Sequence, residues 1–206
     1  MLSLFKNRSA LFFLPVIFFS LFLISGCGSK LPEDKSIGDQ SYSLINQDSS
    51  KVVFPDAFKG KIVVMSFIYT NCPDICPLTT HNMQMIQEQV KKDNIKNVQF
   101  VELSFDPTRD TPSILKKYGD IRNINYGNFE FLTGKKSAVD TLIHHMNVFA
   151  IPSDTTFTKS GQPVYFFTHT DRITLLDQNG RIRNEYRGSK ANVGEIIKDI
   201  KTLGDN

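Results

Sequence analysis

The sequence is poor in the residues that mark fibrous or disulfide-rich proteins, and it is not unusually rich in charge. Its 206 residues include 12 glycines, 9 prolines and 3 cysteines, and 40% of the residues are hydrophobic and 22% charged. These fractions exclude a collagen-like, an intrinsically disordered and a disulfide-dense chain. After the first 26 residues, 22 basic residues face 21 acidic ones, and no cluster of Lys and Arg stands out. We therefore expect no nucleic-acid partner.

Common catalytic motifs are also absent. The sequence contains no His-Glu-x-x-His zinc motif and no Gly-x-Gly-x-x-Gly nucleotide fingerprint. The segment Gly134-Lys135-Lys136-Ser137 resembles the end of a phosphate-binding loop, but Phe129 stands where that motif requires its first glycine. The cysteines and histidines remain as the main candidates for chemistry.

The first 26 residues differ from the rest in hydrophobicity. Six of the 17 phenylalanines lie there, together with Lys6, Arg8 and no acidic residue. The apolar run at 10–24 has 15 residues, whereas a membrane-spanning helix needs about 20. We interpret residues 1–26 as a signal peptide.

This leader ends in Leu23-Ile24-Ser25-Gly26, directly before Cys27. Small residues before a cysteine resemble the lipobox of bacterial lipoproteins, which implies cleavage before Cys27 and attachment of lipid to its sulfur. An uncleaved membrane anchor is the alternative, and either would export the remainder of the chain. We expect a protein lipid-anchored to the cell membrane on its extracytoplasmic side (periplasmic or outer face), with residues 27–36 as a polar tether.

Lipid on Cys27 would leave two cysteines, Cys72 and Cys76. In an exported protein they form a structural disulfide, a redox pair or two metal ligands. Closing so short a loop contributes little entropy, so stabilisation is a weak reason for a disulfide. The Cys-x3-Cys spacing, one residue longer than in thioredoxin-type motifs, lets both sulfurs face one metal ion and still permits a disulfide.

Residues 37–206 show the hydrophobic patterns of one α/β domain. Strands are expected at 61–69, 98–105, 129–132, 164–168, 172–177 and 181–186, with a hairpin turn at Asn179-Gly180. Helices are expected at 77–92, 112–118, 138–146 and 193–203. The unbroken apolar run at 61–69 indicates a central strand covered on both faces. The order of elements predicts a mixed sheet flanked by helices.

Cys72 and Cys76 lie where that central strand ends and a helix begins. Open α/β sheets hold their ligands at the carboxyl ends of strands. A helix N-terminus also stabilises a nearby thiolate, which lowers the pKa of the thiol. This location therefore favours a chemical role for the pair.

Two thiolates do not complete a metal site, and the chain has four histidines. His169 follows the expected strand at 164–168, which could bring it beside the cysteines; a purely structural histidine is the alternative. His81, early in its helix, would point away from the thiols. His144 and His145 are adjacent on a helix and cannot both face one metal. Two thiolates with one imidazole suit Cu(I), whereas zinc requires a fourth ligand.

Four segments, taken together, resemble the Sco/SenC family. They are Phe67–Pro77 with Cys-Pro-Asp-Ile-Cys-Pro, Ser104–Pro112 with Asp-Pro-Thr-Arg-Asp-Thr, Phe131–Gly134, and Thr168–Gly180 with Thr-His-Thr and Leu-Leu-Asp-Gln-Asn-Gly. They follow the family order across nearly all of residues 37–206. The resemblance implies a thioredoxin-like fold, an N-terminal membrane anchor, and one copper ion bound by Cys72, Cys76 and His169.

The resemblance also implies a function. Family members help to build the copper centre of cytochrome c oxidase, so the expected partners are the oxidase subunit that carries this centre and a thioredoxin-like reductant of the cysteines. Cu(I) is the first candidate for the bound ion and Cu(II) a further one. A thiol–disulfide oxidoreductase that acts on partner cysteines without a metal is an alternative function, and a redox or copper sensor is another.

One position departs from the family pattern. The family commonly has Asp directly before the ligand histidine, and here Thr168 occupies that place. An acidic neighbour can orient the imidazole or supply an oxygen near the metal, so its absence bears more on Cu(II) than on Cu(I). Asp171 is a candidate substitute. Asp106, Arg109 and Asp110 are expected either to support their loop by charge pairing or to contact a partner.

Overall fold

The computed structural model describes residues 31–32, 35–161 and 163–204. The expected signal peptide (1–26) and Cys27 lie outside these residues. Within the described ranges, no helix combines the length and the apolar character needed to cross a membrane.

A seven-stranded mixed sheet forms the centre of the domain, in the order β11-β10-β3-β4-β5-β1-β2. Its strands are β1 (Tyr42–Asn46), β2 (Lys51–Phe54), β3 (Ile62–Ile68), β4 (Val98–Ser104), β5 (Phe129–Gly134), β10 (Ile173–Leu176) and β11 (Ile182–Tyr186). β3, β4 and β5 are parallel, and β10 runs antiparallel to β3 on its other side. β3 is therefore the inner strand between the parallel and the antiparallel part.

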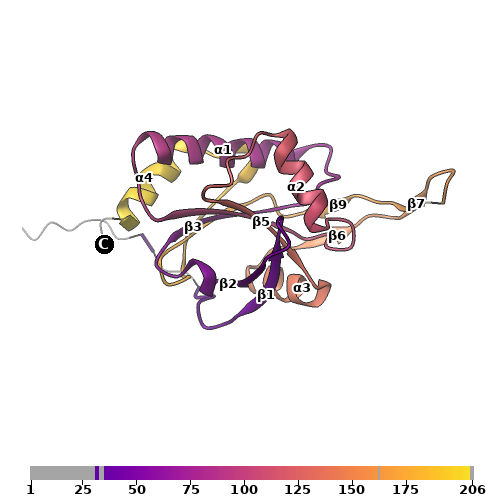
Figure 1. Ribbon diagram of the computed structural model, residues 1–206, viewed down its shortest axis with the longest axis horizontal. Coiled ribbons are helices and arrows are strands. Elements are labelled where there is room, and N and C mark those ends of the chain that lie inside the picture. Colours follow the sequence, from indigo (N-terminus) through magenta and orange to yellow (C-terminus); the bar gives the residue numbers. More distant parts are fainter. Residues whose placement is uncertain (1–30, 33–34, 162, 205–206) are drawn as a thin grey trace, which may run out of the picture. The chain divides into compact units, whose positions relative to one another are not determined.

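Helices cover both faces of this sheet (Figure 1). They are α1 (Ile75–Lys92), α2 (Pro112–Ile121), α3 (Lys136–His145) and α4 (Val193–Gly204), with short 3-10 helices η1 (Asp56–Phe58) and η2 (Gly188–Lys190). α1 and α4 lie on one face and α3 lies on the other. All seven residues of β3 and all seven of β4 are buried, as expected for strands covered on both faces.

Two small sheets lie apart from the main one. β6 (Ala150–Pro152) pairs with β9 (Phe167–His169), and β7 (Thr156–Phe157) pairs with β8 (Pro163–Val164). The β7–β8 hairpin extends away from the rest of the domain (Figure 1). The histidine predicted as a ligand, His169, is the last residue of β9.

The predicted α/β architecture is confirmed, with differences at its borders. α1 begins at Ile75, two residues before the predicted start, and α2 runs on to Ile121. Thr111 is the N-cap of α2, and its side-chain oxygen accepts a hydrogen bond from the N–H of Ile114. Gly180, in the predicted hairpin turn, has a φ of 73°, which a glycine adopts without steric cost.

The prediction of one strand at 164–168 is wrong. The segment is divided between β8 and β9, because the backbone of Phe166 bonds with Ser153 and the hydroxyl of Tyr165 turns to Asp106. The hairpin of β1 and β2 at the sheet edge was not predicted at all.

Contacts with the sheet begin before residue 37. The carbonyl of Lys35 accepts a hydrogen bond from the N–H of Ile182 at 2.8 Å. Ser36 forms a bridge with Arg181, and the Arg183 side chain donates to the carbonyl of Pro32 at 3.0 Å. The described residues of the expected tether therefore lie against β11 and the turn before it.

Glu102 is a carboxyl group in the middle of this core. It lies on β4 with no exposed surface and accepts hydrogen bonds from the hydroxyls of Ser66 at 2.8 Å and Thr80 at 3.0 Å. Burial raises its pKa to about 7, against the smaller opposing effect of these two donors. The folded protein therefore holds the proton of Glu102 more tightly than the unfolded chain does.

We expect Glu102 to make the fold less stable as pH rises. Between about pH 4.5 and about pH 7, the folded state binds more protons at this site, so the free energy of unfolding should fall by about 3 kcal/mol. Glu102→Gln should remove this fall, measured by chemical denaturation at pH 5 and pH 8. Glu130→Gln, on the neighbouring strand, is the control and should behave like the parent protein. An unchanged pH dependence in Glu102→Gln would contradict the assignment.

Candidate metal centre

The loop that carries the cysteines joins β3 to α1. β3 ends at Ile68 and α1 begins at Ile75, so Cys72 lies in the loop and Cys76 is the second residue of the helix. Cys76 is 1% exposed, whereas Cys72 is partly exposed. The backbone N–H of Cys76 points at the sulfur of Cys72, at 3.4 Å. One of the free N–H groups of the helix N-terminus thus serves the Cys72 sulfur.

Asp110 fixes the start of this loop. Its carboxylate accepts hydrogen bonds from the N–H of Thr70 at 3.0 Å, from the Thr70 hydroxyl at 2.5 Å and from the Ser104 hydroxyl at 2.5 Å. Asp110 is 1% exposed, so these bonds satisfy a buried carboxylate. The loop two residues before Cys72 is therefore held to the end of β4.

Asp106 and Arg109 support the neighbouring segment. The two side chains form an ion pair at 2.5 Å. The Tyr165 hydroxyl donates to Asp106 at 3.0 Å, and the Arg109 guanidinium lies 3.6 Å from the centre of the Tyr165 ring. Because Tyr165 precedes His169 by four residues, these contacts favour the loop-support interpretation of Asp106 and Arg109.

His169 reaches the cysteines from the other end of the chain. Ile173 of β10 pairs with Ser66 of β3 in antiparallel register, so the residues before Ile173 lie beyond the carboxyl end of β3. His169 Nε2 is 3.6 Å from Cys76 Sγ. The donor atoms of Cys72, Cys76 and His169 all lie within 4.8 Å of one another. The structure thus brings together the three residues that the sequence singled out.

The imidazole of His169 is held in a defined orientation. Its Nδ1 lies 3.0 Å from the carbonyl oxygen of Thr170; a carbonyl only accepts, so this contact places the proton on Nδ1 and leaves Nε2 as the electron-pair donor. The ring packs against Phe105 and Tyr69, with centroids 4.8 and 5.9 Å away. Phe167 packs against both of these rings at 5.1 Å.

The two cysteines have opposite acidities. The pKa of Cys72 falls to about 3, chiefly because Cys76 donates a hydrogen bond to its sulfur, an effect that outweighs burial and is reinforced by His169 and by backbone N–H groups. The same contact, with burial, raises the pKa of Cys76. Burial lowers the pKa of His169, but the contacts with Cys72 and the Thr170 carbonyl outweigh it, and the net shift is upward. The resting pair is therefore a Cys72 thiolate beside a Cys76 thiol.

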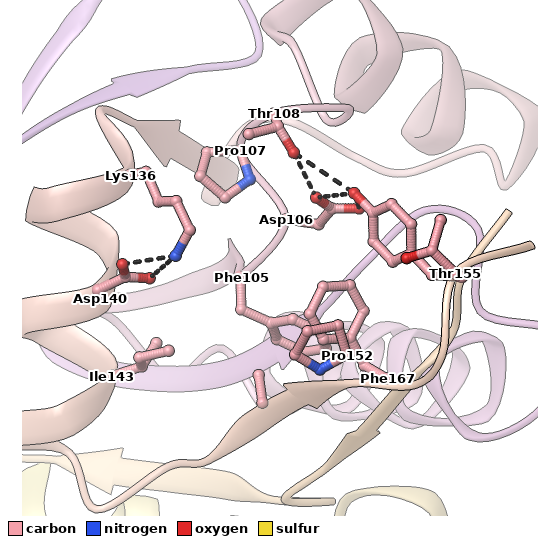
Figure 2. A pocket seen from close by; sticks show the side chains of 12 residues that line it. Phe105, Asp106, Pro107, Thr108, Lys136, Asp140, Ile143, Pro152, Thr155 and Phe167 are labelled. Atoms are coloured by element: carbon pink, nitrogen blue, oxygen red, sulfur yellow. Dashed lines mark hydrogen bonds and ion pairs between the residues drawn. The ribbon is translucent and has the colours of Figure 1, made fainter. Parts of the chain in front are cut away.

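An open cleft leads to these groups. It has a volume of about 320 Å³, and its walls include Cys72, Pro73, Phe166 and His169. A second pocket of about 260 Å³ adjoins it, with Phe167 in the wall of both. Figure 2 shows this second pocket, with Lys136 and Asp140 paired on one side and Asp106 near Thr108 on the other. The cysteine–histidine group is therefore reachable from solvent through the first cleft.

The donor set fits a soft metal ion. Two sulfurs and one imidazole nitrogen form a group that includes no fourth His, Cys, Asp or Glu among the described residues. Metal–sulfur and metal–nitrogen bonds of about 2.0–2.3 Å keep donor atoms roughly 3.5–4 Å apart. The 3.6 Å between Cys76 Sγ and His169 Nε2 matches that spacing. These three residues could hold a metal ion with small side-chain adjustments.

The remaining histidines lie elsewhere. His81 is exposed on α1 and His144 is exposed on α3, as expected. His145 is partly buried, and its Nδ1 pairs with the hydroxyl of Tyr42. None of the three belongs to the metal-binding group found among the described residues.

Thr168, at the position where the family has an acid, and Asp171, its candidate substitute, both make their contacts elsewhere. Thr168 is exposed and pairs with Ile151 in the small sheet. Asp171, considered as a substitute for the missing acid, directs its carboxylate to Ser189 and Thr79 instead. The expectation that Asp171 supplies an oxygen to the metal finds no support in this arrangement.

The aromatic residues around the His169 imidazole were not predicted from the sequence. Tyr69 and Phe105 directly follow β3 and β4, so their places at the carboxyl edge of the sheet could have been inferred from the strand ends. Phe167 and Tyr165 carry no such signal, because their approach depends on how the β6–β9 segment folds back. Only the structure reveals that Tyr69, Phe105 and Phe167 form a group of rings on one side of His169, with Tyr165 packed against Phe167.

We expect Cys72 of the reduced full chain to react with iodoacetamide well below the ordinary pH range of a thiol. Because its pKa is about 3, the rate at pH 5 should be close to the rate at pH 8, with peptide mapping by mass spectrometry separating Cys72 from Cys76 and Cys27. Cys76→Ala removes the main hydrogen-bond donor and should slow the reaction at pH 5. Cys76→Ser keeps a donor and serves as the matched control. A rate that titrates near pH 9 in the parent protein would refute the assignment.

Comparison with known proteins identifies the family to which the chain belongs. The sequence profile of the SCO1/SenC family matches residues 30–205. The chain is similar to a SCO1/SenC family lipoprotein from Bacillus anthracis, with 30% identity, a TM-score of 0.66, and coverage of 80% of this chain and 93% of that one.

Two further structures are similar. ScoI of Bradyrhizobium japonicum with copper bound shares 29% identity, with a TM-score of 0.66 and coverage of 80% of this chain and 98% of that one. BsSco, a Sco family cytochrome c oxidase assembly protein with a disulfide switch, shares 25% identity, with a TM-score of 0.68 and coverage of 85% and 98%. The thioredoxin-like fold implied by the resemblance is confirmed by these likenesses. Since the family profile covers far more than half of the sequence, the chain belongs to the SCO1/SenC family.

Proposed function

We propose that this protein is a membrane-anchored, extracytoplasmic copper chaperone that binds one copper ion and helps to assemble the copper centre of cytochrome c oxidase. The observation that carries the proposal is the convergence of Cys72, Cys76 and His169 within 4.8 Å at an open cleft. The related ScoI of Bradyrhizobium japonicum, whose structure has copper bound, supports copper as the cargo. BsSco supports oxidase assembly as the process.

The donor set favours Cu(I) over zinc. Cu(I) prefers thiolates and accepts three ligands, whereas a structural zinc ion requires four. Two cysteine sulfurs and one imidazole nitrogen match the first requirement. With Thr168 in the position before the histidine, no carboxylate of the described residues joins this group as a hard oxygen donor, which favours Cu(I) over Cu(II).

The residues also suit a site that must both load and release its cargo. Cys72 is already a thiolate and lines the cleft, so it can accept an incoming ion without losing a proton. Cys76 must lose its proton, and His169 must be neutral, before either can act as a ligand. A partner thiolate that enters the cleft can replace the partly exposed Cys72 first, leaving the buried Cys76 for the final exchange.

The location and partners are part of the proposal. Cys27 would carry the lipid after removal of residues 1–26, and the start of the 27–36 segment would connect the lipid to the domain, which already holds Pro32, Lys35 and Ser36. The likeness to a SCO1/SenC family lipoprotein supports the anchor. The receiving partner would be the oxidase subunit that carries the copper centre, and a thioredoxin-like protein would keep Cys72 and Cys76 reduced.

The opposite acidities of the cysteines favour a second candidate, a metal-independent thiol–disulfide oxidoreductase. The Cys72 thiolate would attack a partner disulfide, forming a mixed disulfide and releasing one partner thiolate. Cys76 would then lose its proton and attack Cys72, releasing the second partner thiolate and leaving a Cys72–Cys76 disulfide. His169 has no necessary part in these two steps, so its removal separates the two functions.

We expect one Cu(I) per chain to bind tightly to the reduced full chain, titrated against a chromophoric chelator with Cys27→Ser in every variant. Cys72→Ser, Cys76→Ser and His169→Ala should each weaken retention, because each removes one of three ligands. His81→Ala, an exposed histidine on α1, is the matched control and should bind like the parent. Copper retention should also fall at acid pH, because protons compete with the metal for Cys76 and His169, whose pKa values are raised.

The same variants decide between the candidates. Weak binding by the parent, with His169→Ala no worse, would contradict the copper function and favour disulfide exchange. In that case His169→Ala should leave reduction of a model disulfide unchanged while Cys72→Ser abolishes it.

A further inference from the structure

The segment that carries His169 is weakly tied to the main sheet. Among the described residues, its strand, β9, pairs only with β6, to one side of the seven-stranded sheet (Figure 1). The main sheet resumes at Ile173, four residues after His169. Main-chain pairing with the sheet therefore does not fix the distance between His169 and the cysteines. Local main-chain bonds, from the N–H of Thr170 to the carbonyl of Phe149 at 3.0 Å and from the N–H of Gly188 to the carbonyl of Asp171 at 3.4 Å, and side-chain contacts must do so.

Asp171 makes such contacts. Its carboxylate accepts hydrogen bonds from the N–H of Ser189 at 2.8 Å and the Ser189 hydroxyl at 2.6 Å. It also shares the Thr79 hydroxyl, 3.2 Å away, with the carbonyl of Ile75 at 3.1 Å. Asp171, Thr79 and Ser189 are called the Asp171 clamp below. Thr79 lies three residues after Cys76 on α1, and Asp171 lies two residues after His169. The clamp therefore ties the segment of one ligand to the helix of another.

The residues around the Asp171 clamp are closely packed. A Cβ on Gly188 would lie 2.7 Å from Asp171 Oδ1 and 2.9 Å from Thr79 Cγ2, closer than side-chain atoms approach. Asn82 of α1 also donates to the carbonyl of Gly188 at 2.7 Å. η2 is thus held directly against α1, and Asp171 is bonded to η2 beside Gly188, where an added side chain would force Asp171 or Thr79 to move.

Hydrogen bonds, and not an ion pair, carry these contacts. The nearest cation is Arg187, with 3.5 Å between Nε and Asp171 Oδ2, and its side chain is 66% exposed. Such exposed pairs contribute little. The Asp171 side chain is 14% exposed, so its bonds to Ser189 and Thr79 are largely shielded from water. An Asn at this position would keep most of these bonds.

We propose that Asp171 is a positioning residue that holds His169 at ligand distance from Cys76 without contacting the metal itself. This inference rests on the proposed function. Without the clamp, His169 would be located by the packing of Tyr69, Phe105 and Phe167 and by the main-chain bonds of Thr170 and Asp171. The imidazole would then spend less time at the cysteines, and the site would lose affinity as if the histidine were partly missing.

The first test measures Cu(I) retention against a chelator for Asp171→Ala, Asp171→Asn and Asp199→Ala. Loss of a partner that orients a ligand typically costs about 10–100-fold in metal affinity, which is the loss expected for Asp171→Ala. Asp171→Asn should restore most of the affinity. Asp199 is the matched control: it is 8% exposed, and its carboxylate accepts bonds from Asn184 and Tyr186 of β11 and none from the His169 segment. Asp199→Ala should bind copper like the parent.

A double-mutant cycle shows whether Asp171 acts through His169. If it does, Asp171→Ala should cost little in a chain that already carries His169→Ala, because the positioned ligand is gone. Equal losses in both backgrounds would overturn the proposal, and so would parent-like retention by Asp171→Ala. Ser189→Ala, which removes one of the three bonds, should give an intermediate loss if Asp171→Ala fails to fold.

Hydrogen exchange on the reduced, metal-free protein tests the clamp independently of copper. Peptides covering 167–172 should exchange faster in Asp171→Ala than in the parent, and Asp199→Ala should leave them unchanged. If the parent does not bind copper, the proposed function fails, but this measurement still decides whether Asp171 holds the histidine segment. Unchanged exchange in Asp171→Ala would overturn the clamp itself.

Discussion

The antiparallel pairing of β10 with β3 is the constraint on which the site depends. β3 carries the chain to Ile68 and then to the cysteine loop, so the thiols lie at the carboxyl end of that strand. β10 begins beside the same end, where Ile173 pairs with Ser66. Any residue a few positions before Ile173 must therefore lie near the cysteines. A parallel strand in the same place would have delivered His169 to the opposite edge of the sheet.

The β10–β3 pairing brings His169 to the same edge of the sheet as the cysteines, and local contacts set the distance between His169 and the cysteines. On one side of the imidazole, Tyr69, Phe105 and Phe167 pack as rings against each other or against His169. Two residues after His169, the Asp171 carboxylate accepts hydrogen bonds from Ser189 of η2 and Thr79 of α1. The histidine thus lies between an apolar and a polar support. Cys76, by contrast, is fixed by the first turn of α1, and Cys72 lies in the loop that Asp110 holds through Thr70.

Much of the fold was predictable because burial leaves a clear pattern. β3 is apolar except for Ser66, since helices cover both of its faces, and Asn179-Gly180 marks its hairpin because Gly180 adopts a positive φ. The cysteines could be placed from the strand end alone. His169 could not, since its approach depends on pairing between strands more than 100 residues apart in sequence, Ser66 and Ile173; the family resemblance supplied it. Asp171 was considered only as a substitute for the missing acidic neighbour of the histidine, and the direction of its carboxylate, toward Ser189 and Thr79, could not be inferred from the sequence.

The most direct test of this account is the X-ray absorption spectrum of copper in the reduced, Cu(I)-loaded full chain with Cys27→Ser. The arrangement of Cys72, Cys76 and His169 predicts a first shell of two sulfur atoms and one imidazole nitrogen. His169→Ala should lose the nitrogen contribution while both sulfurs remain. A first shell of sulfur alone in the parent protein, or one unchanged by His169→Ala, would contradict the claim that the fold brings the histidine to the cysteines to bind copper.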